Sequence, residues 1–438
     1  MSKYTMSPQE YYKSKLGTVQ DALDLIQPGD SLVWTIHGNE PKVFLDNLHT
    51  IAERLTGPVE LWSCVHRFPH EVSSSTDPKY HNLHMQTFFY DGQARQCHPS
   101  GRISYFPVNL HNYGEELYKC KQPNVFVCQC SAMDEKGYVH IACDLQWTLE
   151  SFQTAEKVIY EVNPRAPKCW GECALPIYRA SAIYEVDHQL YQLADPPMGD
   201  AEKTVADYCA SLVKDGDCIQ LGFGGIPNAI GFDLLDKEDL SIHTEQIGAS
   251  MARLIANGNV TNRNKTTDRY MSVAAFAIGD DFLYNFMDRH PRIYMRRGRY
   301  TNDPFVICQN DNVVSVNAAL QIDLTGQVAA EAIGHLQFSG CGGATDFAYG
   351  AYHSKGGRAI LAQVSTTKKG TISRIQPILQ PGSIVSVSRN LTDMVITEYG
   401  IAKLRGKTVG DRVEELINVA HPDFRAELRK EANKYMYY

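Results

Sequence analysis

The chain repeats part of its own sequence at a nearly constant spacing. Gly29-Asp30 and Gly216-Asp217 each stand between an apolar pair and a short apolar run, at an offset of 187 residues. The segments 134–137 and 323–326, which both begin with Asp and end with Gly, match at an offset of 189. Two separate matches at almost one offset indicate a duplicated unit of domain size. We therefore predict two related domains in tandem.

Each copy has the same order of local signals. Residues 25–48 and 212–235 both contain a Gly-Asp turn, a short apolar strand, a glycine-containing loop, a proline and an apolar periodic segment. Alternating strands and helices predict the α/β class, with open, largely parallel sheets that carry helices on both faces. The run 195–200 contains paired prolines, which continue neither a helix nor a central strand. We therefore place the domains at 1–195 and 200–438.

Several further elements follow from hydrophobic pattern. Apolar runs predict buried strands at 124–130, 358–362 and 383–387. A helix is expected from Pro227 onward, because proline suits the first turn of a helix. The segment from Val409 to the end reads as mostly helical, with a break near His421-Pro422.

Composition excludes several classes of protein. The 438 residues are 43% hydrophobic and 21% charged, which is typical of globular chains, and the net charge of -8 gives no hint of a broad nucleic-acid face. Such totals leave room for a local basic pocket that binds a phosphorylated ligand. The start lacks an apolar secretory core, and the longest uncharged apolar stretch, 271–279, is too short to span a bilayer. We expect a cytoplasmic protein that binds neither nucleic acid nor membrane.

The twelve cysteines admit two interpretations. Disulfides are one, but free thiols in a reducing cytoplasm are favoured in a long chain without a signal peptide. Cys128 and Cys130 face the same side of a predicted strand, and Cys169 and Cys173 stand close in sequence. Neither pair has a second pair at zinc-binding spacing, so we predict no metal site.

Three segments of the second domain have the residues for chemistry. The first is QLGFGGIP, residues 220–227, where glycines follow a strand and lead into a helix. Such a loop lets the backbone approach a ligand and favours negative charge at the helix N-terminus. It lacks the glycine spacing of the dinucleotide fingerprint. The alternative is a tight strand-to-helix connection without a ligand.

The second segment is SIHTEQIG, residues 241–248, which places Glu245 near the end of a predicted strand. The carboxyl ends of parallel strands border the crevice in which open α/β sheets bind ligands. A carboxylate there has the position of a nucleophile or base. An ordinary exposed strand-end glutamate is the alternative.

The third segment is QFSGCGGA, residues 337–344. A glycine cluster with a serine suits an oxyanion or phosphate cradle, and a plain surface loop is the alternative. Lys355 and Lys368-Lys369 follow. They are either phosphate contacts or ordinary solvated lysines.

Together these segments resemble the class I coenzyme A transferases, and most of all the branch of 4-hydroxybutyrate and butyryl-CoA:acetate CoA-transferases within the acetyl-CoA hydrolase/transferase group. The resemblance covers nearly the whole chain and is strongest from 212 to 430. It is carried by QLGFGGIPNAI (220–230), SIHTE (241–245), GNVTNRNKT (258–266), VSVNAALQIDLTGQV (314–328), QFSGCGGATDF (337–347), GAYHSKGG (350–357), ITEYGIAKLRGKT (396–408) and NVAHPDFR (418–425). The family's tandem α/β domains agree with the repeat.

The resemblance implies a role for each matching residue. Glu245 matches the family's catalytic glutamate, which forms a glutamyl-CoA thioester in a ping-pong reaction. Residues that match the family's CoA-contacting segments are Gln220, Gly222, Phe223, Gly224, Gly225, Ile226, Leu320, Gly342 and Gly343. The activity implied is CoA transfer from a short-chain acyl-CoA, such as butyryl-CoA or 4-hydroxybutyryl-CoA, to acetate or another short carboxylate. CoA is then a co-substrate, no cofactor is bound permanently, and we expect a homo-oligomer.

The chain also departs from the family pattern. Relatives often have an Asp-Gly pair shortly after the catalytic glutamate, where this chain has Ala249-Ser250, and the His-, Tyr- and Phe-rich segment 66–112 matches only loosely. Both departures bear on the substrate. Two other functions stay open: an acyl-CoA hydrolase on the same fold, in which water accepts the acyl group, and a non-catalytic CoA-binding protein. The presence of Glu245 and of both glycine loops disfavours the non-catalytic CoA-binding protein.

Overall fold

The computed structural model describes residues 6–193, 197–367 and 369–435. The chain divides into two compact units. The first comprises Met1–Leu193 and Ala274–Tyr300, and the second comprises Ala194–Val273 and Thr301–Tyr438. The expected boundary run at 195–200 begins with two residues outside the described part of the chain, and the division at that run stays a prediction.

The first unit is built on a seven-stranded sheet with the order β10-β7-β5-β1-β2-β3-β4, in which every neighbouring pair is parallel. Its strands are β1 (Ser31–Trp34), β2 (Val59–Ser63), β3 (Leu83–Thr87), β4 (Ile103–Tyr105), β5 (Val125–Cys130), β7 (Lys157–Val162) and β10 (Ala182–Glu185). The smaller strands are β6 (Tyr138–His140), β8 (Trp170–Gly171), β9 (Ala174–Pro176) and β14 (Ile293–Met295), and β13 (Ser272–Ala277) begins at the border with the second unit.

Helices connect these strands. They are α1 (Pro8–Lys15), α2 (Val19–Leu23), α3 (Lys42–Asn47), α4 (Glu71–Ser74), α5 (Gly92–Cys97), α6 (Leu110–Glu116), α7 (Thr148–Thr154) and α11 (Asp281–Met287), and α12 (Gly298–Thr301) ends at the border. Strand β5 is buried along its whole length, as its apolar run predicts.

The second unit has the sheet order β25-β24-β20-β15-β11-β12. Its strands are β11 (Cys218–Leu221), β12 (Ser241–Ile247), β15 (Val313–Asn317), β20 (Arg358–Ala362), β24 (Met394–Thr397) and β25 (Gly400–Lys403). All neighbours in this order are parallel except β24 and β25, which form a hairpin. Short strands β16 (Gln321–Asp323), β17 (Val328–Ala329), β18 (Ala332–Ile333), β19 (Leu336–Gln337), β21 (Thr366–Thr367), β22 (Ile372–Ser373) and β23 (Ile375–Gln376) form small ladders beside it.

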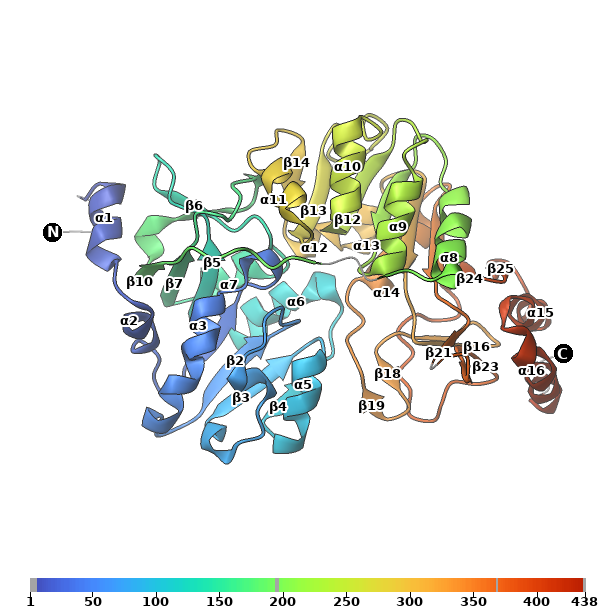
Figure 1. Ribbon diagram of the computed structural model, residues 1–438, viewed down its shortest axis with the longest axis horizontal. Helices are drawn as coiled ribbons and strands as arrows, with labels where there is room; N and C mark the ends of the chain where they lie inside the picture. The colour runs from blue at the N-terminus through green and yellow to red at the C-terminus, as the bar shows by residue number, and fades with distance from the viewer. Residues whose placement is uncertain (1–5, 194–196, 368, 436–438) are drawn as a thin grey trace. The chain divides into compact units, whose positions relative to one another are not determined.

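Helices connect the strands of the second unit. They are α8 (Asp200–Ser211), α9 (Gly225–Asp233), α10 (Ala249–Asn257), α13 (Pro304–Ile307), α14 (Ala344–His353), α15 (Val409–Val419) and α16 (Pro422–Lys434). Apolar side chains of α14, α15 and α16 form one buried cluster with strand residues Val313 of β15, Ala359 and Leu361 of β20 and Val395 of β24. Figure 1 shows α8, α9 and α10 side by side in the same unit. The predicted α/β class with largely parallel sheets in two related domains is confirmed.

The repeat in the sequence corresponds to one local structure that occurs twice. The backbone turns through a left-handed glycine at Gly29 (φ 89°) and again at Gly216 (φ 81°). The next residue, Asp30 or Asp217, accepts a hydrogen bond from a backbone N–H three residues earlier. Each aspartate also pairs with a cation at the start of a strand, Lys157 in the first copy and Arg358 in the second. A left-handed turn favours glycine, so the Gly-Asp pair marks the same structural position in both units.

One predicted strand is wrong. Residues 383–387 have no regular secondary structure, and only Val387 bridges to a neighbour, Val328. Ile384 and Val385 are exposed instead of buried. An apolar run becomes a strand only where a neighbouring strand has free backbone groups to pair with. The other expectations agree better: β20 has the predicted bounds, the C-terminal helices separate at His421, and α9 begins two residues before Pro227.

None of the helices in the described ranges combines the length and the apolar character needed to cross a bilayer. The twelve cysteines are free thiols, and most of them are buried.

Candidate active site

The chemistry-bearing segments of the second unit meet at one edge of its sheet. Strand order reverses between β11 and β15: the chain continues from β11 to β12 on one side and returns on the other with β15 and β20. Ligands of open α/β sheets bind at the carboxyl ends of the strands, next to such a reversal. The first glycine loop follows β11 directly, and Ala318 follows β15. The predicted crevice is therefore present.

Glu245 lies on β12, close to its carboxyl end. The register pairs Ile219 with Ile242, and carrying it forward three residues places Gly222 level with Glu245. Asn302 donates a hydrogen bond from Nδ2 to Oε2 of Glu245 over 2.7 Å. The backbone N–H of Gly343 donates a second hydrogen bond to the same carboxylate. The glutamate and the second glycine loop, which lie about a hundred residues apart in sequence, are thus brought together.

The surroundings of Glu245 keep its carboxylate basic. Burial raises the pKa of Glu245 to about 7, and the buried carboxylate of Asp346 adds to the rise. The hydrogen bonds from Asn302 and from the Gly343 N–H stabilise the charged form and limit the rise in this pKa. The side chain is still partly exposed at the strand end. A carboxylate that is poorly solvated and within reach of a ligand has the properties of a nucleophile.

Glycine is the residue type that fits position 343. A Cβ there would overlap Oε2 of Glu245 and Nδ2 of Asn302. Its neighbour Gly342 has a left-handed backbone (φ 52°) in open space. The Gly342-Gly343 pair therefore serves a tight turn and a close approach to the carboxylate, and α14 begins immediately afterwards.

The first glycine loop lines a pocket of about 320 Å³. Residues Phe223 to Pro227 form one wall, and Val316 to Ala318 form another at the end of β15. The remaining lining residues are Pro197, Met198, Glu202, Ala362, Gln363, Val364 and Arg374. Gly224 has φ 131°, a conformation that favours glycine, and α9 begins at the next residue. The N–H groups of the first turn of a helix have no acceptor within that helix, so they are available to an anion or a developing oxyanion.

Two of the predicted CoA-contacting residues, Gln220 and Leu320, do not line this pocket. Gln220 is buried, and its amide exchanges two hydrogen bonds of 3.2 Å with the amide of Asn317. Because Asn317 lines the pocket, the geometry supports an indirect role for Gln220, that of holding Asn317. Leu320 lies two residues beyond the pocket residue Ala318, and its backbone N–H bonds to Ala329. The predicted direct contacts of both residues remain predictions.

Lys355, which follows the second glycine loop, does not lie at this edge. Lys355 precedes β20, at the amino end of that strand, and its side chain is mostly exposed beside Asp311. The parallel arrangement puts the pocket at the other end of β20. Lys355 is therefore an ordinary solvated lysine. Lys368 lies outside the described residues.

Cys341, within the second glycine loop, is a poor nucleophile. Burial raises the pKa of its thiol, and the carboxylates of Glu331, Asp346 and Glu245 raise that pKa further. A thiol in such surroundings stays protonated at neutral pH, and the thiolate is the reactive form. The carboxylate of Glu245 is therefore the better nucleophile of this edge.

Sequence reasoning missed Asn302. The residue follows α12 and is 57 positions from Glu245, and its amide is completely buried. No motif or spacing in this region of the sequence distinguishes it from any other asparagine. Ala249-Ser250, the departure from the family pattern, opens α10, where Ser250 packs closely against Gly231 of α9.

In the first unit, hydrogen bonds hold the loop that corresponds to the first glycine loop. The loop after β1 reads IHGNEP, residues 36–41, in place of the glycine loop. Asn39 donates from Nδ2 to the carbonyl of Gln129 on β5, and Gln129 donates back to the carbonyl of Gly38. Glu40 is fully buried and accepts from the backbone N–H of Arg67 at 2.7 Å. These contacts leave the loop after β1 bonded to its own unit, whereas its counterpart after β11 lines a pocket.

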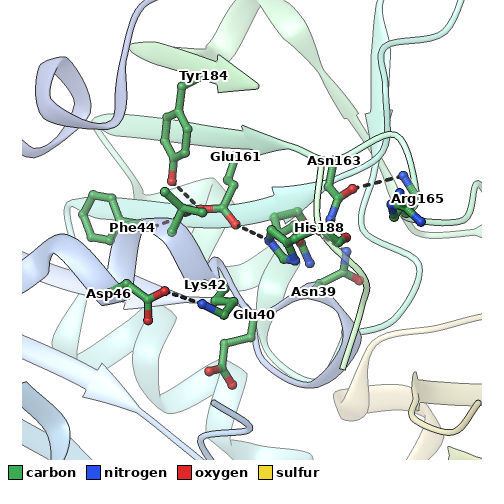
Figure 2. A network of polar contacts seen from close by, with 12 residues as sticks. Asn39, Glu40, Lys42, Phe44, Asp46, Glu161, Asn163, Arg165, Tyr184 and His188 are labelled. Atoms are coloured by element: carbon green, nitrogen blue, oxygen red, sulfur yellow. Dashed lines mark hydrogen bonds and ion pairs between the residues drawn. The ribbon is translucent and has the colours of Figure 1, made fainter. Parts of the chain in front are cut away.

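Figure 2 shows the polar network beside this loop. Glu161 on β7 is completely buried, and Oε2 accepts from the Tyr184 hydroxyl at 2.6 Å and from the backbone N–H of Phe44 at 3.0 Å. Phe44 belongs to the first turn of α3, whose own N-cap residue, Pro41, makes no side-chain bond. The carboxylate of Glu161 therefore caps α3 and fixes it on the sheet.

The His-rich segment 66–112 also makes most of its polar contacts within the first unit. His66 lies 2.8 Å from Asp91 through Nδ1, and Asp91 in turn caps α5. His70 lies between two carboxylates, 2.6 Å from Glu40 and 3.1 Å from Asp46. These contacts give His66 and His70 a structural role in the first unit.

The described residues contain no group of three or more His, Cys, Asp or Glu side chains placed to hold a metal ion. Cys173 bonds to the carbonyl of Cys169, and the thiols of Cys128 and Cys130 are buried on one strand.

Comparison with known proteins identifies the class of enzyme. Residues 1–191 match the acetyl-CoA hydrolase/transferase N-terminal domain, and residues 279–432 match the C-terminal domain of the same family. Succinyl-CoA:cyclohexane-1-carboxylate CoA transferase of Geobacter metallireducens is 39% identical over 98% of this chain and 97% of its own length. The 4-hydroxybutyrate coenzyme A transferase of Clostridium kluyveri is 37% identical over 98% of this chain and all of its own.

The fold agrees with these matches. The crystal structure of RipA from Yersinia pestis superposes with a TM-score of 0.93 at 34% identity, over 99% of this chain and 100% of that one. The chain therefore belongs to the acetyl-CoA hydrolase/transferase family, and within it to the CoA-transferases. The family predicted from the sequence motifs is confirmed.

Proposed function

We propose that Glu245 is the nucleophile of a ping-pong acyl-CoA:carboxylate CoA-transferase, and that the two glycine loops bind CoA and the oxyanion. The observation that carries this proposal is the juxtaposition of Glu245, Gly343 and Asn302 at the strand edge that also bears the glycine-loop pocket. A raised carboxylate pKa supports the same role.

The first half-reaction frees the acyl group. An oxygen of the Glu245 carboxylate attacks the thioester carbonyl carbon; a C–O bond forms, the C–S bond breaks, and the products are an acyl-glutamyl anhydride and CoA thiolate. The thiolate then attacks the glutamyl carbonyl carbon. A C–S bond forms, the anhydride C–O bond breaks, and the acyl group leaves as a free carboxylate while CoA stays on Glu245.

The second half-reaction runs the same bonds in reverse with another carboxylate. That carboxylate attacks the glutamyl thioester and releases the thiolate, which then attacks the new acyl carbonyl and departs as the new acyl-CoA. Negative charge develops on a carbonyl oxygen in every step, and backbone N–H donors of the glycine loops are suited to stabilise it. No proton is transferred and no ATP is used, because one thioester and one carboxylate are exchanged for another pair.

The substrates are carboxylic acids and their CoA thioesters. Relatives act on 4-hydroxybutyrate and on cyclohexane-1-carboxylate by name. We propose a short-chain donor such as butyryl-CoA or 4-hydroxybutyryl-CoA with acetate as the acceptor, a cytoplasmic location, and a homo-oligomeric assembly. CoA serves as a co-substrate, and the scheme requires no permanently bound cofactor.

An acceptor panel tests the activity. One acyl-CoA donor is offered to acetate, propionate, butyrate, 4-hydroxybutyrate, succinate and cyclohexane-1-carboxylate, and the new acyl-CoA is quantified by chromatography. Transfer to at least one acid that greatly exceeds release of free CoA supports the transferase. If release of free CoA in water outruns transfer to every acid, the enzyme is a hydrolase. Glu245→Ala should abolish both transfer of CoA to an acid and hydrolysis by water, while the circular dichroism spectrum stays unchanged.

A further inference from the structure

We propose that Gln363 is a substrate-recognition residue whose side-chain amide hydrogen-bonds the pantetheine arm of the bound acyl-CoA. This inference rests on the proposed function, since it assigns the glycine-loop pocket to CoA. It names a residue that neither the sequence motifs nor the second glycine loop contains.

The buried amide of Gln363 has unused hydrogen-bonding capacity. The residue follows β20 directly, and its backbone N–H bonds to the carbonyl of Ile396 at 3.0 Å. Its side chain is only 3% exposed, and within the described part of the chain neither Nε2 nor Oε1 has a hydrogen-bond partner. Burying an amide with no partner destabilises the folded protein, so an unsatisfied pair of this kind needs an explanation.

The location of Gln363 supplies that explanation. The residue lines the pocket of about 320 Å³ together with the glycine loop and the end of β15. Arg374 lines the same pocket and is held in place by a hydrogen bond to the carbonyl of Ala319 at 3.0 Å. Most other lining side chains are apolar, among them Met198, Phe223 and Val364. An apolar pocket with a few fixed polar groups is typical of a ligand site.

The two unused atoms identify the class of ligand. Nε2 can only donate and Oε1 can only accept, so a partner that satisfies both must offer an acceptor and a donor. A carboxylate has no hydrogen to donate at neutral pH, and an unsubstituted acyl group such as butyryl offers none either. Of the proposed donors only 4-hydroxybutyryl-CoA has a hydroxyl on its acyl group, whereas the CoA moiety is common to all of them. The pantetheine arm contains two secondary amides between short apolar segments, so it supplies C=O and N–H groups and also fits an apolar wall.

Replacing the amide by an apolar side chain of similar size tests the proposal. In Gln363→Met the free protein should become more stable, with Tm raised by about 2–4 °C, because an unsatisfied buried amide is removed. Binding of CoA, measured by calorimetry, should weaken about tenfold. A residue with a purely structural role would lower Tm when replaced and would leave the affinity for CoA unchanged.

Truncated donors locate the contact on the ligand. With acyl-CoA and acyl-pantetheine, kcat/KM of Gln363→Met should fall about tenfold, and with an acyl thioester of a simple amide-free thiol it should equal that of the wild type. Equal losses for both kinds of donor, or an unchanged Kd for CoA, would overturn the assignment. Calorimetry with CoA needs no turnover, so it decides the role of Gln363 even if the wild-type enzyme transfers CoA to none of the acids.

Discussion

The amide of Asn302 is bonded to the carboxylate of Glu245, with 2.7 Å between Nδ2 and Oε2. Asn302 is completely buried, and its Oδ1 has no partner among the residues the structure describes. The amide therefore has one strong interaction, and that interaction holds one carboxylate oxygen of Glu245. That hydrogen bond fixes the orientation of the carboxylate that we propose attacks the thioester.

The rate of the first half-reaction should depend on pH through Glu245. The pKa of this carboxyl is raised to about 7, so the reactive carboxylate is a minority form at pH 6 and the majority form at pH 8. We expect kcat/KM for the acyl-CoA to rise about tenfold between pH 6 and pH 8 and to level off above. Single-turnover kinetics with a buffer series measures this, and a flat profile down to pH 5 would contradict the raised pKa.

The same pKa makes a prediction for stability. A carboxyl whose pKa is higher in the folded protein than in the unfolded chain destabilises the fold as pH rises from about 4.5 to 7. Glu245→Gln should therefore raise the unfolding free energy by about 1–2 kcal/mol at pH 8 and leave it unchanged at pH 4. Denaturant titrations at the two pH values measure the unfolding free energies. If Glu245→Gln changed the unfolding free energy equally at both pH values, the raised pKa of Glu245 would not be the cause.

Removing the Asn302 amide should impair the nucleophile through its charge and its position. The hydrogen bond from Asn302 lowers the pKa of Glu245, so in Asn302→Ala the acid limb of the pH profile should move to higher pH. We also expect kcat to fall by a factor of about 10–100, because the carboxylate loses its orientation. The shift of the pH profile separates this role from general damage to the fold, which would lower the rate equally at all pH values.

A methyl group at position 343 should inactivate the enzyme. In Gly343→Ala the new Cβ overlaps the carboxylate of Glu245 and the amide of Asn302, so one of them must move. We expect kcat to fall at least a hundredfold with Tm lowered only slightly. Gly101→Asn is the matched control, because that glycine lies outside both glycine loops, its site is open and asparagine tolerates the left-handed backbone there. Equal losses in both variants would show that general damage to the fold, and not the contact with Glu245, lowers the rate.

In the first unit, Glu161 should contribute to stability without touching the chemistry. Its buried carboxylate caps α3, accepts from Tyr184 and lies 3.4 Å from Nε2 of His188, so Glu161→Ala removes three contacts and should cost about 3 kcal/mol. Tyr184→Phe removes one of these bonds only and should cost about 1 kcal/mol. Urea denaturation followed by circular dichroism compares the two. A Glu161→Ala variant as stable as the wild type would contradict the capping role.

The sequence predicted those features that neighbouring residues determine, namely turns, loops and strand ends. The Gly-Asp pairs marked the left-handed turns before β1 and β11, and the glycine runs marked the loop that lines the pocket and the loop that contacts Glu245. Glu245 was found because a strand end is recognisable from the run of residues around it. In each case the residues that form the recognisable pattern are the same residues that form the turn, loop or strand end.

Features that depend on distant partners were missed or wrong. Asn302 reaches Glu245 only because the fold brings together positions 57 residues apart, and nothing near Asn302 in sequence records that contact. The run at 383–387 has the composition of a strand, but only Val387 pairs with a neighbour, through a single bridge to Val328. Gln363 follows a correctly predicted strand, yet its missing hydrogen bonds become visible only when every neighbour is placed.

The central claim is that Glu245 becomes covalently bonded to CoA, and mass spectrometry of the digested protein tests it most directly. The enzyme is incubated with acyl-CoA in the absence of a carboxylate acceptor, quenched in acid and digested. We predict that the peptide containing Glu245 gains the mass of CoA less one water, that added acetate removes this mass, and that Glu245→Ala shows none. An adduct on another residue, such as Cys341, or no adduct on a protein that still transfers CoA, would contradict the account.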